Sequence, residues 1–101
     1  MARDFLENND TYVLWGYGST AKRLHRALAM ENKKVSHIVD INPGRLGKRI
    51  QGARVIASDA VAGLEEHKHI VSVARQTGRN RVRKIMKSFD LLEGRDFVCA
   101  A

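Results

Sequence analysis

Several features that mark specialised classes of protein are scarce in this sequence. It has one cysteine and one proline in 101 residues, and aromatic residues make up only 6% of the chain. A single cysteine excludes an internal disulfide, and Cys99 lies in an apolar run, so we expect a buried, reduced thiol in a cytoplasmic protein. The few aromatic residues are scattered, which disfavours a stacking platform for single-stranded nucleic acid.

Long apolar runs are missing as well. No stretch of about 18 apolar residues could span a membrane, and no segment resembles a cleavable secretion signal. The hydrophobic fraction of 44% is ordinary for a folded protein, and the length suits one domain. We therefore expect an N-terminal arm over residues 1–11 and a single domain over residues 12–101.

Positive charge is in excess. The chain has 18 Lys and Arg residues against 11 Asp and Glu, which gives a formal net charge of +7. This balance favours an anionic partner: a nucleotide, a phosphosugar, nucleic acid or an acidic lipid surface. The net charge thus predicts that the partner is negatively charged, and other features must predict which molecule it is.

Short apolar runs alternate with amphipathic segments along the chain. The runs predict strands over residues 12–15, 35–40, 54–57, 70–74 and 96–100. Helical spacing of apolar residues, with Ser58 or Asp59 and Thr77 or Asn80 as candidate caps, predicts helices over residues 19–31, 58–66 and 79–90. The stretch that begins with Asn42-Pro43-Gly44 is predicted to be an irregular loop.

This alternation predicts an α/β fold. Helical crossovers between successive strands produce a parallel sheet with helices on both faces. Right-handed crossovers and a glycine-rich first turn make 3-2-1-4-5 the expected strand order. We therefore predict a three-layer Rossmann-like domain with a five-stranded parallel sheet.

A glycine-rich turn between the first strand and the first helix carries the main functional prediction. It reads Gly16-Tyr17-Gly18-Ser19-Thr20-Ala21. Gly16 permits a tight turn, Gly18 lets the backbone approach a phosphate, and Ala21 allows close packing of helix on strand. The helix N-terminus adds unpaired N–H groups and a partial positive charge, and Ser19 and Thr20 add hydroxyl donors. We predict that this turn binds a nucleotide phosphate; the alternative is a turn that binds nothing.

Two further segments are expected at the same edge of the sheet. Asp40 ends the second strand, 22 residues after Gly18, where a carboxylate accepts hydrogen bonds from ribose hydroxyls, and Ile41 follows it in the predicted site. The loop after the fourth strand holds Arg75 and Gln76, which we expect to face the phosphate or the base. The alternative for Asp40 is an exposed carboxylate that caps the following turn.

The remaining motifs do not predict catalysis or a metal site. His67 and His69 have the spacing of one strand face, but no cluster of Cys, His or carboxylate residues completes a metal site. Exposed or hydrogen-bonded buried positions are the expected roles of these histidines. The last predicted helix is strongly basic, which is more typical of a solvated face than of a partner surface. We therefore predict no catalytic residues and no metal ligands.

These motifs together resemble a family. The segment Val13-Leu14-Trp15 with the glycine turn, followed by Val39-Asp40-Ile41-Asn42-Pro43, resembles the Rossmann-like nucleotide-sugar-binding modules of bacterial polysaccharide-biosynthesis enzymes. Gly78, Asn80 and Arg83 match a helix start in the N-terminal domain of sialic-acid-type sugar O-acyltransferases. The run from Glu93 to Phe97 is similar to the end of the C-terminal module of some family 2 glycosyltransferases.

The resemblance covers roughly residues 12 to 100 and implies binding rather than turnover. The β-helix that carries acyltransferase catalysis has no counterpart in the chain, nor does a glycosyltransferase catalytic domain. The resemblance thus implies a transferase-associated module that binds a nucleotide or nucleotide sugar, is not catalytic on its own, and works with a parent catalytic domain or a second copy of itself.

Two other functions stay open at the level of sequence. One is the NAD(P)-binding domain of an oxidoreductase, which usually needs a second domain for its substrate. The other is a basic interaction module for a protein partner or, less favoured, nucleic acid. The cofactor is therefore undetermined between a nucleotide sugar and NAD(P).

Overall fold

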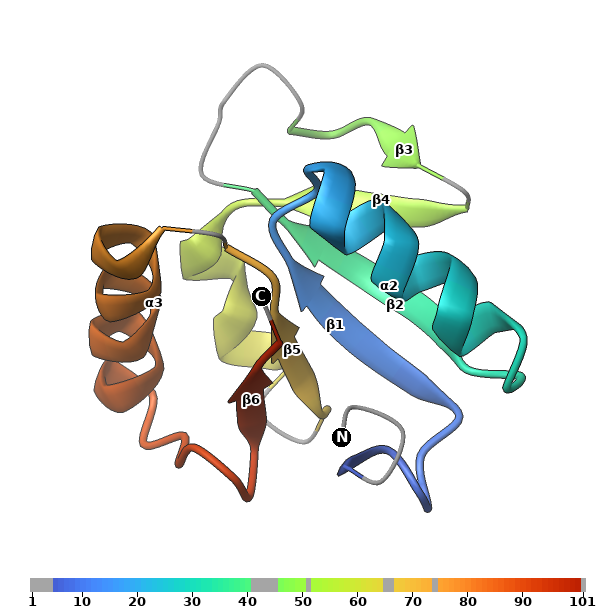
Figure 1. Cartoon of the computed structure of the whole chain (residues 1–101). Helices are drawn as coiled ribbons and strands as arrows, with labels where there is room; N and C mark the ends of the chain where they lie inside the picture. The colour runs from blue at the N-terminus through green and yellow to red at the C-terminus, as the bar shows by residue number, and fades with distance from the viewer. Residues whose placement is uncertain (1–4, 41–45, 51, 65–66, 74, 101) are drawn as a thin grey trace.

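The chain folds as a sheet between two helical layers (Figure 1). The computed structural model describes residues 5–40, 46–50, 52–64, 67–73 and 75–100. Within them the strands are β1 (Thr11–Trp15), β2 (Lys34–Val39), β3 (Arg49–Ile50), β4 (Ala53–Ile56), β5 (His69–Val71) and β6 (Phe97–Cys99). The helices are α2 (Ser19–Ala29), the 3₁₀ helix η2 (Ser58–Gly63) and α3 (Gln76–Ser88).

The sheet confirms the predicted fold class and corrects the strand count. Its order is β3-β4-β2-β1-β5-β6, and every neighbouring pair except β3 with β4 is parallel. The five parallel strands therefore follow the order that the sequence predicts. The prediction of a wholly parallel, five-stranded sheet was wrong by one antiparallel edge strand.

The added strand β3 comes from the stretch predicted to be irregular. It pairs with β4 in a hairpin in which Ile50 lies opposite Ala53, and Gly52 between them has a φ of +85°. Glycine adopts this left-handed conformation without steric cost, which allows so short a connection. A strand of two residues has no detectable periodicity, and the glycines of this stretch therefore led to the prediction of an irregular loop. The predicted Asn42-Pro43-Gly44 turn lies outside the described residues.

Alternating side chains of the strands build one core on each face of the sheet. Tyr12 and Leu14 of β1 pack in a cluster with Leu28 of α2, whereas Val13 and Trp15 pack with residues of α3 and η2. Successive side chains of a strand point to opposite faces, so α2 covers one face and α3 the other. This is the layered arrangement predicted from the sequence.

The two α-helices match their predicted bounds only at the start of α2. α2 begins at Ser19, as predicted, but ends at Ala29 instead of residue 31, and α3 runs from Gln76 to Ser88 instead of from 79 to 90, with Arg75 as its N-cap. Neither Thr77 nor Asn80 therefore caps α3. The segment after β4 is a short 3₁₀ helix whose N-cap is Ala57, not Ser58 or Asp59. In the described part of the chain, no helix is long and apolar enough to cross a membrane.

Two contacts close the core beside the glycine turn. Trp15, which ends β1, donates its indole N–H to Nδ1 of the fully buried His69 at 3.0 Å. The indole group can only donate, so the proton of His69 resides on Nε2, which lies 3.0 Å from the Leu64 carbonyl oxygen. His69 is thus a hydrogen-bonded buried histidine, one of the two roles expected from the sequence.

Candidate functional site

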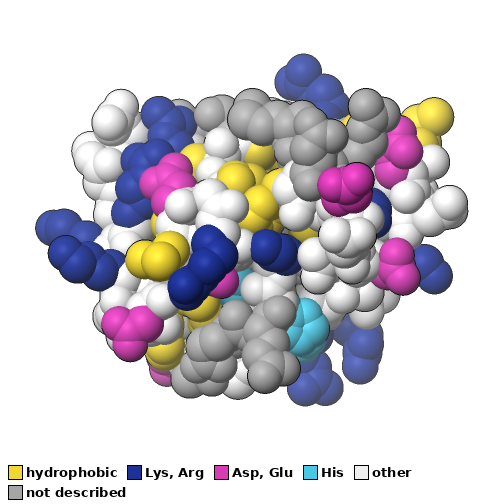
Figure 2. Space-filling model, turned by 90° about the horizontal axis from the view of Figure 1, so that it is seen from below, with side chains coloured by type: hydrophobic (Ala, Val, Ile, Leu, Met, Phe, Trp, Pro, Cys, Tyr) yellow, Lys and Arg dark blue, Asp and Glu magenta, His cyan; other side chains and the backbone are white. Residues whose placement is uncertain are grey.

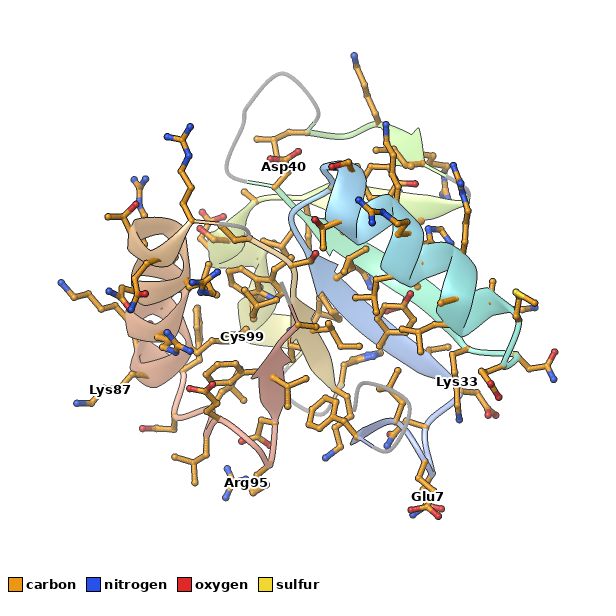
Figure 3. All side chains as sticks on the ribbon, viewed as in Figure 1. Glu7, Lys33, Asp40, Lys87, Arg95 and Cys99 are labelled. Carbon is orange, nitrogen blue, oxygen red and sulfur yellow. The ribbon has the colours of Figure 1, made fainter. Side chains whose placement is uncertain are left out.

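The glycine turn follows β1, at the point where the order of the strands in the sheet reverses. β1 is paired with β2 on one side and with β5 on the other, and the crossovers through α2 and α3 lead away in opposite directions. In open α/β sheets such a point forms a crevice at the carboxyl ends of the strands. Figure 3 shows Asp40 at this edge, with Glu7 and Arg95 at the opposite one.

Gly16 occupies a position that excludes any other residue without strain. Its φ is +88°, and a β-carbon there would lie 2.8 Å from the backbone oxygen of Ser72. Gly78 in the first turn of α3 is equally tight, because a β-carbon would meet Cγ1 of Val73 at 2.5 Å. The two glycines let the turn and α3 close in on the segment that follows β5.

Gly18 differs from Gly16 in both respects. Its φ of −88° is available to any residue, and a β-carbon there would have no atom of the described residues within 4 Å. As far as the described residues extend, the space above Gly18 is open, as the phosphate prediction requires. Gly18 is also the N-cap of α2, which has no side-chain cap and no acidic residue in its first turn. Its first N–H groups and partial positive charge are therefore presented toward this space.

A second helix N-terminus lies at the same edge of the sheet. α3 begins after the exposed residue Arg75, which makes no side-chain cap, and its first turn contains no acidic residue. Arg79 donates from its guanidinium to the carbonyl oxygen of Val73 at 3.2 Å. The positive ends of two helices and these arginines thus flank the crevice.

A small apolar cavity of about 40 Å³ lies inside the crevice. Gly16 and Asp40, both predicted site residues, line it together with the buried Trp15. The other lining residues come mainly from α3 and the segment before it: Val39, Val73, Gly78, Arg81, Val82 and Ile85. The structure therefore brings Asp40 and the start of the turn to one cavity, in which Asp40 and Arg81 are the charged residues.

The other predicted site residues lie around this cavity rather than in its wall. Gly18 and Ser19 are exposed and Thr20 is half-buried in the first turn of α2. Arg75 and Gln76 are exposed at the start of α3. Tyr17 faces the flank of α2, where Lys22 lies over its ring at 5.7 Å. Ile41 lies outside the described residues.

Sequence reasoning missed Ser72, which follows β5 beside Gly16. Its amide donates to the Trp15 carbonyl oxygen at 2.9 Å, the residue is only 6% exposed, and its Oγ has no hydrogen-bond partner among the described residues. By strand alternation it shares a sheet face with Ile70, the face covered by α2. A buried hydroxyl without a partner costs free energy, which a bound polar group would recover. Serine at a strand end carries no signal in the sequence that would single it out.

Residue types that bind metal ions do not gather into a site in the described part of the chain. No three His, Cys, Asp or Glu residues there could hold a metal ion together. His67, which is two residues from His69 in the sequence, lies beside His37, with ring centroids 6.2 Å apart. Burial, and next the neighbouring His67, lowers the pKa of His37 below its ordinary value.

Both signs of charge occur at the two ends of the strands. Figure 2 views the molecule from below, where the strands begin, and shows Asp and Glu side chains among Lys and Arg. At the carboxyl edge, the first turns of both α2 and α3 lack acidic residues, and Asp40 lies at the same edge. The two helix N-termini are thus the parts of this edge that favour an anion.

Comparisons of the whole fold find similar solved structures, among them those of two proteins. RSP, a Rex-family repressor, matches with a TM-score of 0.69 and 14% identity over 93% of this chain and 53% of its own. UDP-D-quinovosamine 4-dehydrogenase from Vibrio fischeri matches with a TM-score of 0.67 and 14% identity, over 81% and 73% of the two chains.

Two further structures of RSP contain bound molecules. One, in complex with beta-NADH, has a TM-score of 0.65 and 15% identity over 96% of this chain and 56% of its own. The other, with beta-NAD⁺ and operator DNA, has a TM-score of 0.65 and 13% identity, with shares of 89% and 49%. The chain spans about half the length of the RSP chains that it matches.

No protein-family model and no curated protein matches the sequence. The predicted likeness to acyltransferases and glycosyltransferases is therefore not shown. At these identities the structural matches establish the architecture alone: the chain has a Rossmann-like α/β fold.

Proposed function

We propose that this domain binds a nucleotide at the carboxyl edge of its sheet, with the phosphates at the glycine turn. The observation that best supports this proposal is the contrast between the two glycines. Gly16 is held tightly against Ser72, whereas Gly18 faces space that is open among the described residues, at an uncapped helix N-terminus. A turn that only joined two elements would need the first glycine but not the second. Backbone N–H groups at such a terminus bind phosphate well.

In this proposal the remaining groups bind the other parts of the ligand. Asp40, which lines the same cavity as Gly16, would accept hydrogen bonds from ribose hydroxyls. Ser72 Oγ would supply a buried donor beside the turn. Arg75 and Gln76, at the exposed start of α3, would meet the outer part of the ligand. Ile41, which follows Asp40 in the sequence, stays a predicted member of the site.

Among nucleotides we favour NAD(H), which differs from the emphasis that sequence resemblance placed on nucleotide sugars. RSP has been solved with NADH and with NAD⁺, and its fold is similar to this one. A nucleotide sugar is the second candidate, because another similar structure is that of UDP-D-quinovosamine 4-dehydrogenase. An association with a sugar-transfer enzyme rests on sequence resemblance alone. We assign any chemistry on the bound nucleotide to a partner, either another domain or a second copy.

Substitution of Gly18 tests the proposal directly. Gly18→Val would place a branched side chain in the space of the phosphate, so NADH affinity should fall at least about tenfold, a loss of 1.4 kcal/mol or more. The single tryptophan, Trp15, lines the cavity and reports binding through its fluorescence. Titrations with NADH, NAD⁺ and a UDP-sugar rank the ligands.

Gly63→Val is the matched control. Like Gly18, Gly63 has open space around its α-carbon, but it lies at the end of η2. It should keep wild-type affinity. Unchanged NADH affinity in Gly18→Val, or no binding of any of the three ligands by the wild type, would contradict the proposal.

A further inference from the structure

Two hollows, each far larger than the cavity in the crevice, lie along the outer flank of α2. One, of about 430 Å³, is lined by Tyr17, Lys22, His25, Arg26, Ala29 and Ile50. A second, of about 440 Å³, shares His25 and Ala29 with the first and extends to Lys33 and Lys34 beyond the helix end. Because they share these residues, the two hollows form one groove between α2 and the β3–β4 hairpin. Figure 1 shows this hairpin at the edge of the sheet.

The groove is lined by charges of one sign. Lys22, Arg26, Lys33 and Lys34 border it, and none of its described lining residues is acidic. Lys33 makes an ion pair with Asp10 at 4.0 Å, and this carboxylate is almost fully exposed. The pair is therefore weak in water, and Lys33 retains most of its positive potential.

The spacing of these cations suits an extended ligand. Lys22 and Arg26 are four residues apart, so they lie on one side of α2 at a separation of about 6 Å along its axis. Lys33 follows at the far end of the helix, which Figure 3 shows well removed from Asp40. A single anionic group could meet only one part of this row.

The groove also has an apolar and aromatic wall. The Tyr17 ring packs edge-on against His25 at a centroid separation of 6.3 Å, and Lys22 lies over the ring. Ala29 and the half-buried Ile50 add aliphatic surface. Burial lowers the pKa of His25, so this imidazole is neutral near pH 7 and can donate or accept a hydrogen bond.

We propose that this groove is a second anion site, which takes a small organic molecule with two or more phosphate or carboxylate groups. Each hollow falls in the size range of small-molecule sites, about 300–1,000 Å³. The row of cations would hold the anionic groups, and Tyr17 with Ile50 would hold the carbon skeleton. The site is distinct from the proposed nucleotide site, although Tyr17 of the glycine turn forms its upper end.

Inorganic tripolyphosphate and citrate serve as probes of the two anion chemistries. Isotope-labelled protein is titrated with each, and the ring proton resonances of His25 are followed by NMR. We expect His25 to shift in a saturable manner with at least one probe. No shift at His25 with either probe would overturn the proposal.

Charge-matched variants separate a built site from diffuse attraction. The double variant Lys22→Gln/Arg26→Gln should weaken the affinity for the better probe at least about tenfold, because two charge-assisted contacts are lost. Lys84→Gln/Lys87→Gln removes the same charge from exposed positions of α3 and should have little effect. Equal loss in both variants would mean that net charge alone attracts the anion, and the proposal would fail.

Gly18→Val distinguishes the two sites. It should leave probe binding at His25 intact even though it blocks the glycine turn. If Gly18→Val abolished probe binding, the anion would occupy the turn, and the groove proposal would fail while the nucleotide proposal stood. Loss of NADH binding together with retained probe binding supports both.

Discussion

At the scale of single residues, the two glycines of the turn have separate physical duties. Gly16 has a positive φ and almost no room for a side chain, whereas Gly18 has neither constraint. The first is therefore a requirement of the fold. The second is a requirement only if something else fills the space, which makes the pair a natural internal control.

Alanine at each position should separate these duties. Gly16→Ala should lower the free energy of unfolding by about 1–3 kcal/mol, because it imposes left-handed strain and a contact with the Ser72 carbonyl. Gly18→Ala should change stability by less than about 1 kcal/mol, because neither strain nor a clash arises. Urea denaturation of the two variants measures both values. Equal destabilisation by the two variants would contradict this prediction, because it would mean that the turn moves to relieve the strain at Gly16.

At the scale of elements, the segment before β1 contributes more to the core than its polar composition indicates. The sequence predicts an arm over residues 1–11, and the structure describes this segment from Phe5 onward. Leu6 is fully buried in the cluster beneath α2, and Lys68 lies over the ring of Phe5 at 4.8 Å. The described part of the segment thus fills the sheet face beside α2.

Truncation of Leu6 tests how far this segment belongs to the domain. Leu6→Ala should cost about 2–5 kcal/mol of unfolding free energy, the usual range for a fully buried leucine. Leu92→Ala is the control, because Leu92 is 55% exposed and should cost far less. Thermal or urea unfolding provides the measurement. A loss below 1 kcal/mol for Leu6→Ala would mean that the segment packs only loosely.

Element boundaries show where sequence patterns reach their limit. The α3 stripe of Val82, Ile85 and Met86 predicts the helix, but not its first turn, where Gln76 and Thr77 are exposed. Gly78 reads as a breaker in the sequence, yet close packing against Val73 requires a glycine there. Tertiary contact, not local preference, extends the helix toward the crevice.

At the scale of the whole molecule, two half-buried histidines couple stability to pH. Burial lowers the pKa of both His25 and His37 in the folded state, and His67 and Arg54 lower that of His37 further. Between the folded pKa and the ordinary value of about 6.5, the unfolded chain binds more protons than the folded one. Stability is therefore full above pH 6.5 and falls as the solution is acidified.

Thermal unfolding as a function of pH tests this coupling. The Tm should fall between pH 7.5 and 5, and His37→Gln should reduce part of that fall by removing one proton-linked group. His25, whose pKa burial also lowers, contributes to the fall that remains. An identical pH profile in His37→Gln would show that His37 does not contribute.

The sequence by itself determined the alternation of strands and helices, the five parallel strands in their order, and the glycine turn at the start of α2. These features follow from local periodicity and from the left-handed conformation that glycine adopts without steric cost, both of which can be recognised in neighbouring residues. Only the tertiary structure decided that Gly16 and Asp40 share a cavity, that Ser72 lies buried beside the turn, and that a basic groove runs along α2. Those features depend on how distant segments approach one another, because the shape of a cavity is set by packing between elements.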